Sequence, residues 1–255
     1  DDDSLRAFAE EPCREFSSRD ITADHWAQFA SKLHYVNVKD GPDALAAKAA
    51  ALEDELGGEP RRLHYLSVPP KAALDVVRTL DAARLVERSR IIMEKPFGTD
   101  LASARSLNAS IHEVFDEQQI FRIDHFLGKE AALNILAFRF ANGLFEPIWN
   151  RNFIDHVQID VPETLSLEGR SAFYEGTGAF KDMVVTHLFQ VMAFMAMEPP
   201  TTLDSDAISE EKNKVFRSML PIEASQVVRG QYQGYLEEPG VSPEYGTETF
   251  VALGA

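Results

Sequence analysis

Short apolar runs alternate with longer amphipathic stretches in the first half of the chain. The short runs, which have the length of buried strands, are at 62–68, 90–93 and 119–123. The longer stretches predict helices at 43–56, 71–86 and 100–115. Strands that alternate with helices in this way are typical of a parallel, doubly wound sheet. Residues 1–123 are therefore predicted to form an α/β domain.

The pattern changes at about residue 124. Helices are predicted at 129–142, 176–197 and 208–219. Strands are predicted at 156–163, 225–235 and 246–253. Here strands and helices do not alternate regularly, which favours an α+β arrangement with an antiparallel sheet. We therefore predict a second domain over 124–255.

Charge and cysteine content narrow the functional classes. The chain of 255 residues carries a formal net charge of −16, which argues against nucleic acid or an anionic membrane surface as a partner. The longest apolar stretch, near Phe189–Met197, is too short to span a membrane. Cys13 is the single cysteine, so no disulfide can form within the chain, and a reducing, cytoplasmic setting is expected.

Two segments follow predicted strands at the sheet edge where ligands of doubly wound domains bind. Pro69 and Pro70 close the first strand, and Lys95 follows the second within "MEKPFG". Lys95 would supply a cation close to a phosphate or a reacting hydroxyl. The alternative is a turn at the end of a strand with solvated charges.

The segment "FRIDHFLGKE" places an acid and several bases directly before a predicted helix. His125 and Lys129 are four residues apart and could both reach one anion at the helix N-terminus, where amide donors and the helix dipole favour phosphate. The alternative is that Asp124 only caps the helix while the bases face water.

His187 lies inside an apolar predicted helix, where a lone histidine is more often a core residue than a base. Asp182 is five residues away, which is about 140° around an α-helix, so the two should point in different directions. A carboxylate partner for His187 would come from elsewhere, and Asp124 is a candidate; such a pair would form a general base. Glu163, at the end of a predicted strand, is by itself most simply an exposed acid.

Four segments occur in a specific order and spacing: "IIMEKPFGTDL", "FRIDHFLGKE", "RFANGLFEPIWNR" and "GAFKDMVVTHLFQ". Together they resemble glucose-6-phosphate dehydrogenase. The resemblance runs from about Arg62 to Tyr235, and more loosely to the end of the chain. It implies oxidation of the C1 hydroxyl of glucose 6-phosphate to a lactone, the first step of the pentose phosphate pathway, with hydride transfer to NADP or NAD. It also implies a dinucleotide-binding domain over 1–123, a substrate domain over 124–255, and a homodimer or tetramer.

The resemblance implies a role for each candidate residue. His187 matches the general base and Asp124 its carboxylate partner. His125 and Lys129 match the phosphate ligands, and Lys95 matches a lysine between sugar and nicotinamide. The remaining matches are Glu163 and Asp182 for the sugar hydroxyls. Pro69 and Pro70, together with Lys95, are expected to contact the cofactor because they follow strands at the ligand-binding edge.

Three departures from the family pattern stand out. The family has Tyr where this chain has Phe126, so one hydroxyl donor to the phosphate is missing. The family's glycine-rich nucleotide fingerprint and a later strand with a lysine motif are expected outside this chain. If the chain were complete, the alternative function would be a non-catalytic phosphosugar-binding or subunit-interacting protein.

Overall fold

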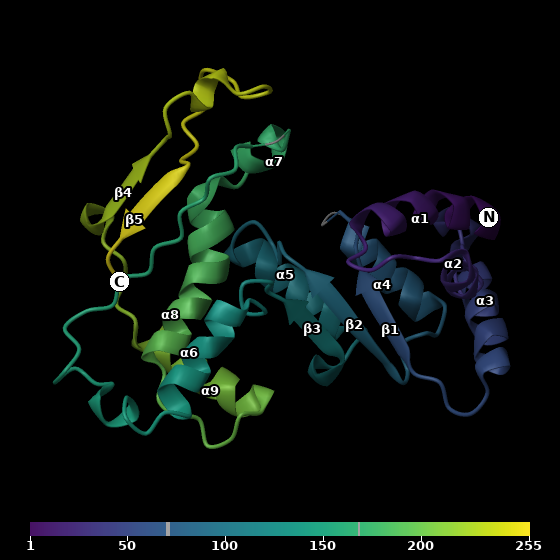
Figure 1. The fold of residues 1–255 in the computed structure, drawn as a ribbon, viewed down its shortest axis with the longest axis horizontal. Helices are drawn as coiled ribbons and strands as arrows, with labels where there is room; N and C mark the ends of the chain where they lie inside the picture. Colours follow the sequence, from purple (N-terminus) through teal and green to yellow (C-terminus); the bar gives the residue numbers. More distant parts are fainter. Residues whose placement is uncertain (70–71, 168) are drawn as a thin grey trace. The chain divides into compact units, whose positions relative to one another are not determined.

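The computed structural model describes residues 1–69, 72–167 and 169–255. These residues form two compact units, which we call unit 1 (Asp1–Ile123) and unit 2 (Asp124–Ala255). Figure 1 shows a parallel sheet with its helices in unit 1 and a mainly helical unit 2 with a small separate sheet. Pro70, predicted as a cofactor contact, lies outside the described residues.

A three-stranded parallel sheet forms the centre of unit 1. Its strands are β1 (Arg62–Leu66), β2 (Ser89–Glu94) and β3 (Ile120–Ile123), in the order β1-β2-β3. Leu66 pairs with Met93, and Glu94 pairs with Ile123, so the carboxyl ends of all three strands lie at one edge. Three predicted site residues follow these strands: Pro69 after β1, Lys95 after β2 and Asp124 after β3.

Helices that follow the strands bury their apolar faces against this sheet. Helix α4 (Ala73–Ala82) buries Val77 and Leu80, and α5 (Leu101–His112) buries Ile111, all in one cluster with Ile91 of β2. The predicted helix 71–86 ends earlier than expected, because Arg84 has a left-handed φ of 57° that an α-helix cannot continue through. The other helical elements of unit 1 are α1 (Asp2–Phe16), α2 (Ala23–Ala30), η1 (Val38–Asp40), α3 (Gly41–Leu56) and η3 (Glu117–Gln119).

Asp2 anchors the first helix to a later segment of unit 1. Its carboxylate accepts a hydrogen bond from the Tyr35 backbone N–H at 2.7 Å and lies 2.9 Å from His34 Nδ1. The Tyr35 amide and His34 lower the pKa of this carboxyl far below its usual range. These bonds hold the start of α1 against residues 34 and 35.

Unit 2 is built around α6 (Glu130–Phe140) and a long helical segment. That segment begins as the π-helix η5 (Phe180–Leu188) and continues as α8 (Phe189–Ala196). The buried Arg139 of α6 donates to the Phe194 carbonyl at 2.6 Å and to the Met197 carbonyl at 2.7 Å, which ties the two elements together. The other helices are η4 (Glu146–Ile148), α7 (Ser171–Glu175), α9 (Ser205–Ser218), η6 (Ala224–Gln226) and η7 (Tyr235–Glu237).

The sheet of unit 2 is antiparallel, as predicted, but smaller than expected. It pairs β4 (Val227–Gly230) with β5 (Phe250–Leu253). The strand predicted at 156–163 is wrong: this segment belongs to no helix or strand. Alternating side chains favour a strand only where a neighbouring backbone pairs with it, and no described strand does so here.

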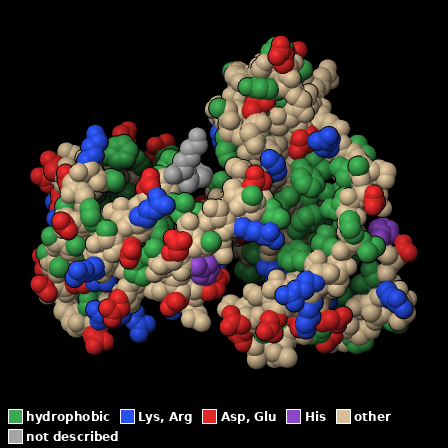
Figure 2. Space-filling model, turned by 180° about the vertical axis from the view of Figure 1, so that it is seen from behind, with side chains coloured by type: hydrophobic (Ala, Val, Ile, Leu, Met, Phe, Trp, Pro, Cys, Tyr) green, Lys and Arg blue, Asp and Glu red, His purple; other side chains and the backbone are tan. Residues whose placement is uncertain are grey.

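Figure 2 shows acidic and basic side chains interspersed over the visible face of unit 1. On the visible face of unit 2, hydrophobic side chains gather in a hollowed area bordered by Lys and Arg. Among the described residues, no helix is both long and apolar enough to cross a membrane.

Candidate functional site

The carboxyl edge of the unit 1 sheet carries two predicted cofactor contacts. Pro69 follows β1 and is exposed, while Lys95 follows β2 directly and is half-buried. Lys95 helps to line a small pocket with Leu66, Val68 and Met93, and its volume is about 40 Å³. That volume suits roughly one or two water molecules, so the pocket itself is too small to hold a dinucleotide.

Gly98 allows the loop after Lys95 to run against the next helix. Its φ is 112°, and a Cβ placed there would lie 2.5 Å from the Ala104 backbone nitrogen. Any larger residue would push the loop away from the start of α5. The glycine therefore helps to set the path of the chain beside Lys95.

Residues 124–129 form a chain of tight turns that leads into α6. Asp124 starts these turns, because its Oδ1 accepts a hydrogen bond from the Phe126 N–H at 2.9 Å. The helix N-cap is Lys129, which makes no side-chain capping bond. The alternative in which Asp124 caps the helix is therefore wrong, and its carboxylate is directed elsewhere.

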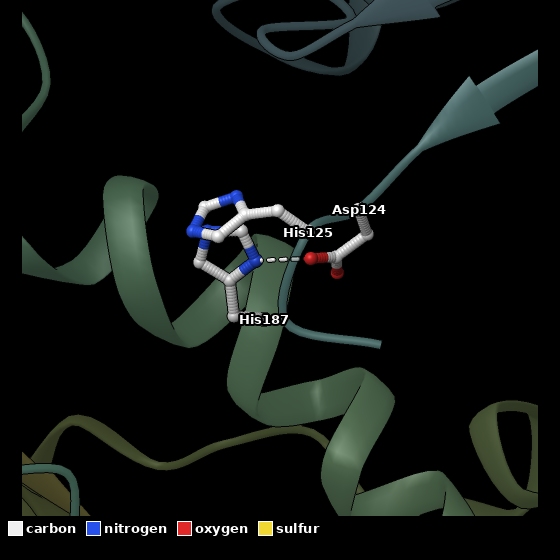
Figure 3. Close-up of side chains that lie close together, drawn as sticks. All are labelled: Asp124, His125 and His187. Atoms are coloured by element: carbon white, nitrogen blue, oxygen red, sulfur yellow. Dashed lines mark hydrogen bonds and ion pairs between the residues drawn. The ribbon is translucent and has the colours of Figure 1, made fainter. Parts of the chain in front are cut away.

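Asp124 and His187 are in direct contact. His187 Nδ1 lies 2.5 Å from Asp124 Oδ1, and the dashed line in Figure 3 marks this bond. An ionised carboxylate can only accept, so Nδ1 carries the hydrogen and Nε2 is the basic nitrogen. His187 is 0% exposed, and Asp124 Oδ2 is buried with no hydrogen-bond partner among the described residues. The pair is thus a buried, oriented imidazole of the kind that general bases use.

The predicted geometry around His187 needs one correction. His187 and Asp182 lie within nine residues of π-helix, in which hydrogen bonds join residues five apart. The separation of about 140° holds only for an α-helix. Positions 182 and 187 therefore lie about one turn apart on the same side of this helix.

Aromatic rings cover His187. The Phe126 ring stacks on it with centroids 4.3 Å apart, and the His125 ring meets it edge-on at 4.7 Å. The Lys129 ammonium lies 3.9 Å from the centre of the same Phe126 ring. The turns thus bring two predicted phosphate ligands close to the predicted base, and the Phe126 ring contacts both Lys129 and His187.

Lys212 of α9 is a residue that sequence reasoning missed. Burial lowers the pKa of this lysine, and the negative charge of Asp124 opposes that shift, so the two groups interact. The Lys212 Nζ also lies 5.4 Å from the centre of the Phe194 ring. The segment "SEEKNKV" has the composition of a solvated helix face, so no sequence signal distinguished Lys212 from its neighbours.

Glu163 and Asp182 are the two further carboxylates predicted at the site. The exposed Glu163 accepts hydrogen bonds from the N–H groups of Leu165 and Thr164, which lower its pKa, and the charge of Lys129 lowers it further. Asp182 is half-buried in η5, and its charge helps to raise the pKa of Tyr174. Both carboxylates belong to unit 2.

Two family models together match almost the whole chain. The model described as "Glucose-6-phosphate dehydrogenase, NAD binding domain" matches residues 1–134. The model described as "Glucose-6-phosphate dehydrogenase, C-terminal domain" matches residues 136–255.

Similar proteins carry the same name. Glucose-6-phosphate 1-dehydrogenase of Rhizobium meliloti is 44% identical over 271 residues, which cover 99% of this chain and 54% of the relative. Glucose-6-phosphate 1-dehydrogenase 1 of Mycobacterium bovis is 44% identical over 203 residues, covering 80% of this chain and 44% of the relative. The chain thus spans about half the length of the curated relatives it matches.

Solved structures agree with the sequence matches. The crystal structure of glucose-6-phosphate 1-dehydrogenase from Mycobacterium avium has a TM-score of 0.88 at 39% identity, over 99% of this chain and 55% of that one. A glucose-6-phosphate dehydrogenase solved in complex with glucose 6-phosphate has a TM-score of 0.88 at 31% identity, with the same coverage. This chain therefore belongs to the glucose-6-phosphate dehydrogenase family.

Proposed function

We propose that this chain carries the central catalytic part of a glucose-6-phosphate dehydrogenase. The reaction oxidises the C1 hydroxyl of glucose 6-phosphate to a lactone, with NADP, or NAD, as hydride acceptor. The observation that carries this proposal is the buried His187–Asp124 pair at 2.5 Å, with His125 and Lys129 on the same turns. Family membership supports the same reaction.

In this proposal His187 removes the C1 hydroxyl proton. Asp124 accepts from Nδ1, which keeps Nε2 as the basic nitrogen and stabilises the imidazolium that forms. As the proton leaves O1, the C1–H bond breaks, its electron pair leaves as hydride, and the C1–O bond becomes a carbonyl. A base held in this way contributes about 10²–10⁴-fold to the rate.

We propose that His125 and Lys129 bind the sugar phosphate. Both side chains are exposed, which suits the recruitment of a dianion from water. His125 also covers His187, so we infer that its ring turns outward to the phosphate as the sugar enters. Binding energy at the phosphate would thus uncover the base and position C1 beside it.

The remaining roles are proposed from the resemblance. Glu163 and Asp182 bind sugar hydroxyls, and the hydrogen-bonded carboxylate of Glu163 is suited to this because it stays ionised. Lys95 orients the sugar and the cofactor, and Pro69 and Pro70 contact the cofactor.

We propose that unit 1 is part of a doubly wound, Rossmann-like coenzyme domain, and that the boundary between coenzyme and substrate domains is at residue 124. The parallel order β1-β2-β3, with Pro69 and Lys95 at its carboxyl edge, supports this because dinucleotides bind at that edge of such sheets. When bound, NADP or NAD supplies the hydride acceptor.

We also propose a cytoplasmic homo-oligomer, a dimer or tetramer, that pairs through the unit 2 sheet. Support comes from large apolar side chains left exposed on the two strands, since Val228 is 61% and Phe250 is 54% exposed.

The test follows the absorbance of reduced nicotinamide with glucose 6-phosphate and NADP. It compares the wild type, His187→Asn and the control His156→Asn, which alters an exposed histidine in a His–Asp contact with Asp155. The chain covers only 54% of the length of the Rhizobium meliloti protein. The same assay is therefore also run on a chimera in which this chain replaces the matching part of that protein.

We expect activity in the wild type and in His156→Asn, and a loss of about 10²–10⁴-fold in His187→Asn. Calorimetry should still detect glucose 6-phosphate binding to His187→Asn. A chimera that binds the sugar phosphate but does not reduce NADP would contradict the proposal and favour the phosphosugar-binding alternative.

A further inference from the structure

Asp124, His125 and His187 form a set of potential metal ligands. Each offers one ligand atom, and the three atoms lie within 4.8 Å of one another. Figure 3 shows the two rings and the carboxylate gathered at one place, from the turns after β3 and from η5. Two imidazole nitrogens and a carboxylate oxygen are a donor set that zinc takes in catalytic sites with an open fourth position.

Small movements would complete the geometry. Ligand atoms about 2.0–2.1 Å from a tetrahedral zinc are roughly 3.3 Å apart. His187 Nδ1 and Asp124 Oδ1 are 2.5 Å apart and would separate slightly. The His125 ring already meets His187 at 4.7 Å between centroids, and its exposed side chain is the one that must approach.

The buried carboxylate favours a cation here. Asp124 Oδ2 is buried and accepts no hydrogen bond from any described residue, so it has lost water without gaining a donor. A metal ion would offset that cost. Lys212, a cation that interacts with Asp124, repels every divalent ion alike, so the choice of metal depends on the ligand types. Imidazole nitrogen selects zinc and its neighbours over the hard ions Mg²⁺ and Ca²⁺.

We propose that these three side chains bind Zn²⁺ or a similar transition-metal ion, and that the bound metal excludes glucose 6-phosphate. The metal would hold His125 over His187, displace the Nδ1 proton and replace the His187–Asp124 hydrogen bond that orients the base. Metal binding itself does not depend on the proposed dehydrogenase activity, whereas the competition with the sugar phosphate rests on it.

The experiment titrates chelator-treated full chain with Co²⁺ and follows the visible absorption of four-coordinate cobalt. The variants are His187→Asn and His125→Asn, and the control is again His156→Asn. Since His125 is exposed, its replacement leaves the core intact if the buried His187→Asn variant misfolds. Circular dichroism checks folding of each protein.

We expect one equivalent of Co²⁺, displaced by Zn²⁺, with affinity weakened about tenfold or more in His187→Asn and His125→Asn and unchanged in His156→Asn. Absence of the cobalt band, or a band that survives His125→Asn, would overturn the metal site. Saturating glucose 6-phosphate should remove the band. A band that persists beside bound sugar phosphate would overturn the competition, while NADP reduction by metal-free protein tests the proposed activity separately.

Discussion

His187 Nδ1 contacts Asp124 Oδ1 at 2.5 Å, although the two residues are 63 positions apart in the chain. The contact joins a turn to a π-helix and lies under the rings of His125 and Phe126. Burial of His187 strengthens the bond and orients the imidazole, because water has little access to the ring. This relationship is the basis of the proposed chemistry.

Replacing Asp124 by Asn should lower kcat by about 10²–10⁴-fold, because the neutral amide neither fixes the His187 tautomer nor stabilises its imidazolium. Steady-state assays of the chimera measure the effect. Asp155→Asn is the control, since Asp155 is fully exposed beside His156. Equal kcat in the two variants would contradict a catalytic role for Asp124.

Phe126→Tyr should strengthen glucose 6-phosphate binding. The Phe126 ring contacts His187 and Lys129, so we expect a hydroxyl on it to lie near the proposed phosphate ligands. A hydrogen bond to a charged group contributes about 1.5–3 kcal/mol, which is roughly tenfold or more in affinity. Calorimetry with glucose 6-phosphate measures the gain, and Phe153→Tyr, at a 68% exposed position, should show none. Unchanged affinity in Phe126→Tyr would place the phosphate elsewhere.

Lys212→Met should reduce kcat/KM on the order of tenfold and shift the acidic limb of its pH profile to higher pH. Without this positive charge, Asp124 loses a nearby counter-charge, and protonated His187 is favoured over the neutral base. The pH profile distinguishes this positioning role from a purely structural one. Lys214→Met is the matched control, because Lys214 is 65% exposed and pairs with Glu211. A profile that does not move in Lys212→Met would refute the idea.

Arg139→Leu should destabilise unit 2 by about 2–4 kcal/mol, because the buried carbonyls of Phe194 and Met197 lose their donors. Urea unfolding measures the change. Arg151→Leu, at an exposed position, should stay within about 0.5 kcal/mol of wild type. A similarly small change in Arg139→Leu would show that the hydrogen bonds of Arg139 contribute little to the free energy of unfolding.

Tyr174 should make the protein less stable at alkaline pH. Burial raises the pKa of its hydroxyl to about 12, whereas in an unfolded chain it titrates near about 10. Between these values the unfolded chain releases the proton that the folded chain retains, so the free energy of unfolding falls as pH rises. Absorbance titration of tyrosinate should detect this late step, and Tyr174→Phe should remove it. If the step that Tyr174→Phe removes lies near about pH 10 in the folded protein, the assignment is wrong.

The parallel sheet of unit 1 could be read from local pattern. The runs at 62–68, 90–93 and 119–123 became β1, β2 and β3, because each places apolar residues where they pack into the core cluster with the helices. The helices between them also formed where predicted, within a few residues. Such elements follow from the residues they contain, since periodicity decides which side chains can be buried together.

The segment at 156–163 shows where local pattern fails. Its alternation is that of a strand, yet a strand exists only if another backbone pairs with it, and that is a property of the tertiary fold. The π-helix at Phe180–Leu188 was missed for a related reason, because its apolar content is also that of an α-helix.

Sequence by itself determined the types of residue at the site: an acid and bases on a turn before a helix, and a histidine in an apolar helix. Specific segments also identified the family to which they belong. Only the tertiary structure decided that Asp124 and His187 touch, that Phe126 and His125 cover the base, and that Lys212 interacts with the carboxylate. Local propensities carry no information about such contacts, because they arise when segments distant in the chain are packed against each other.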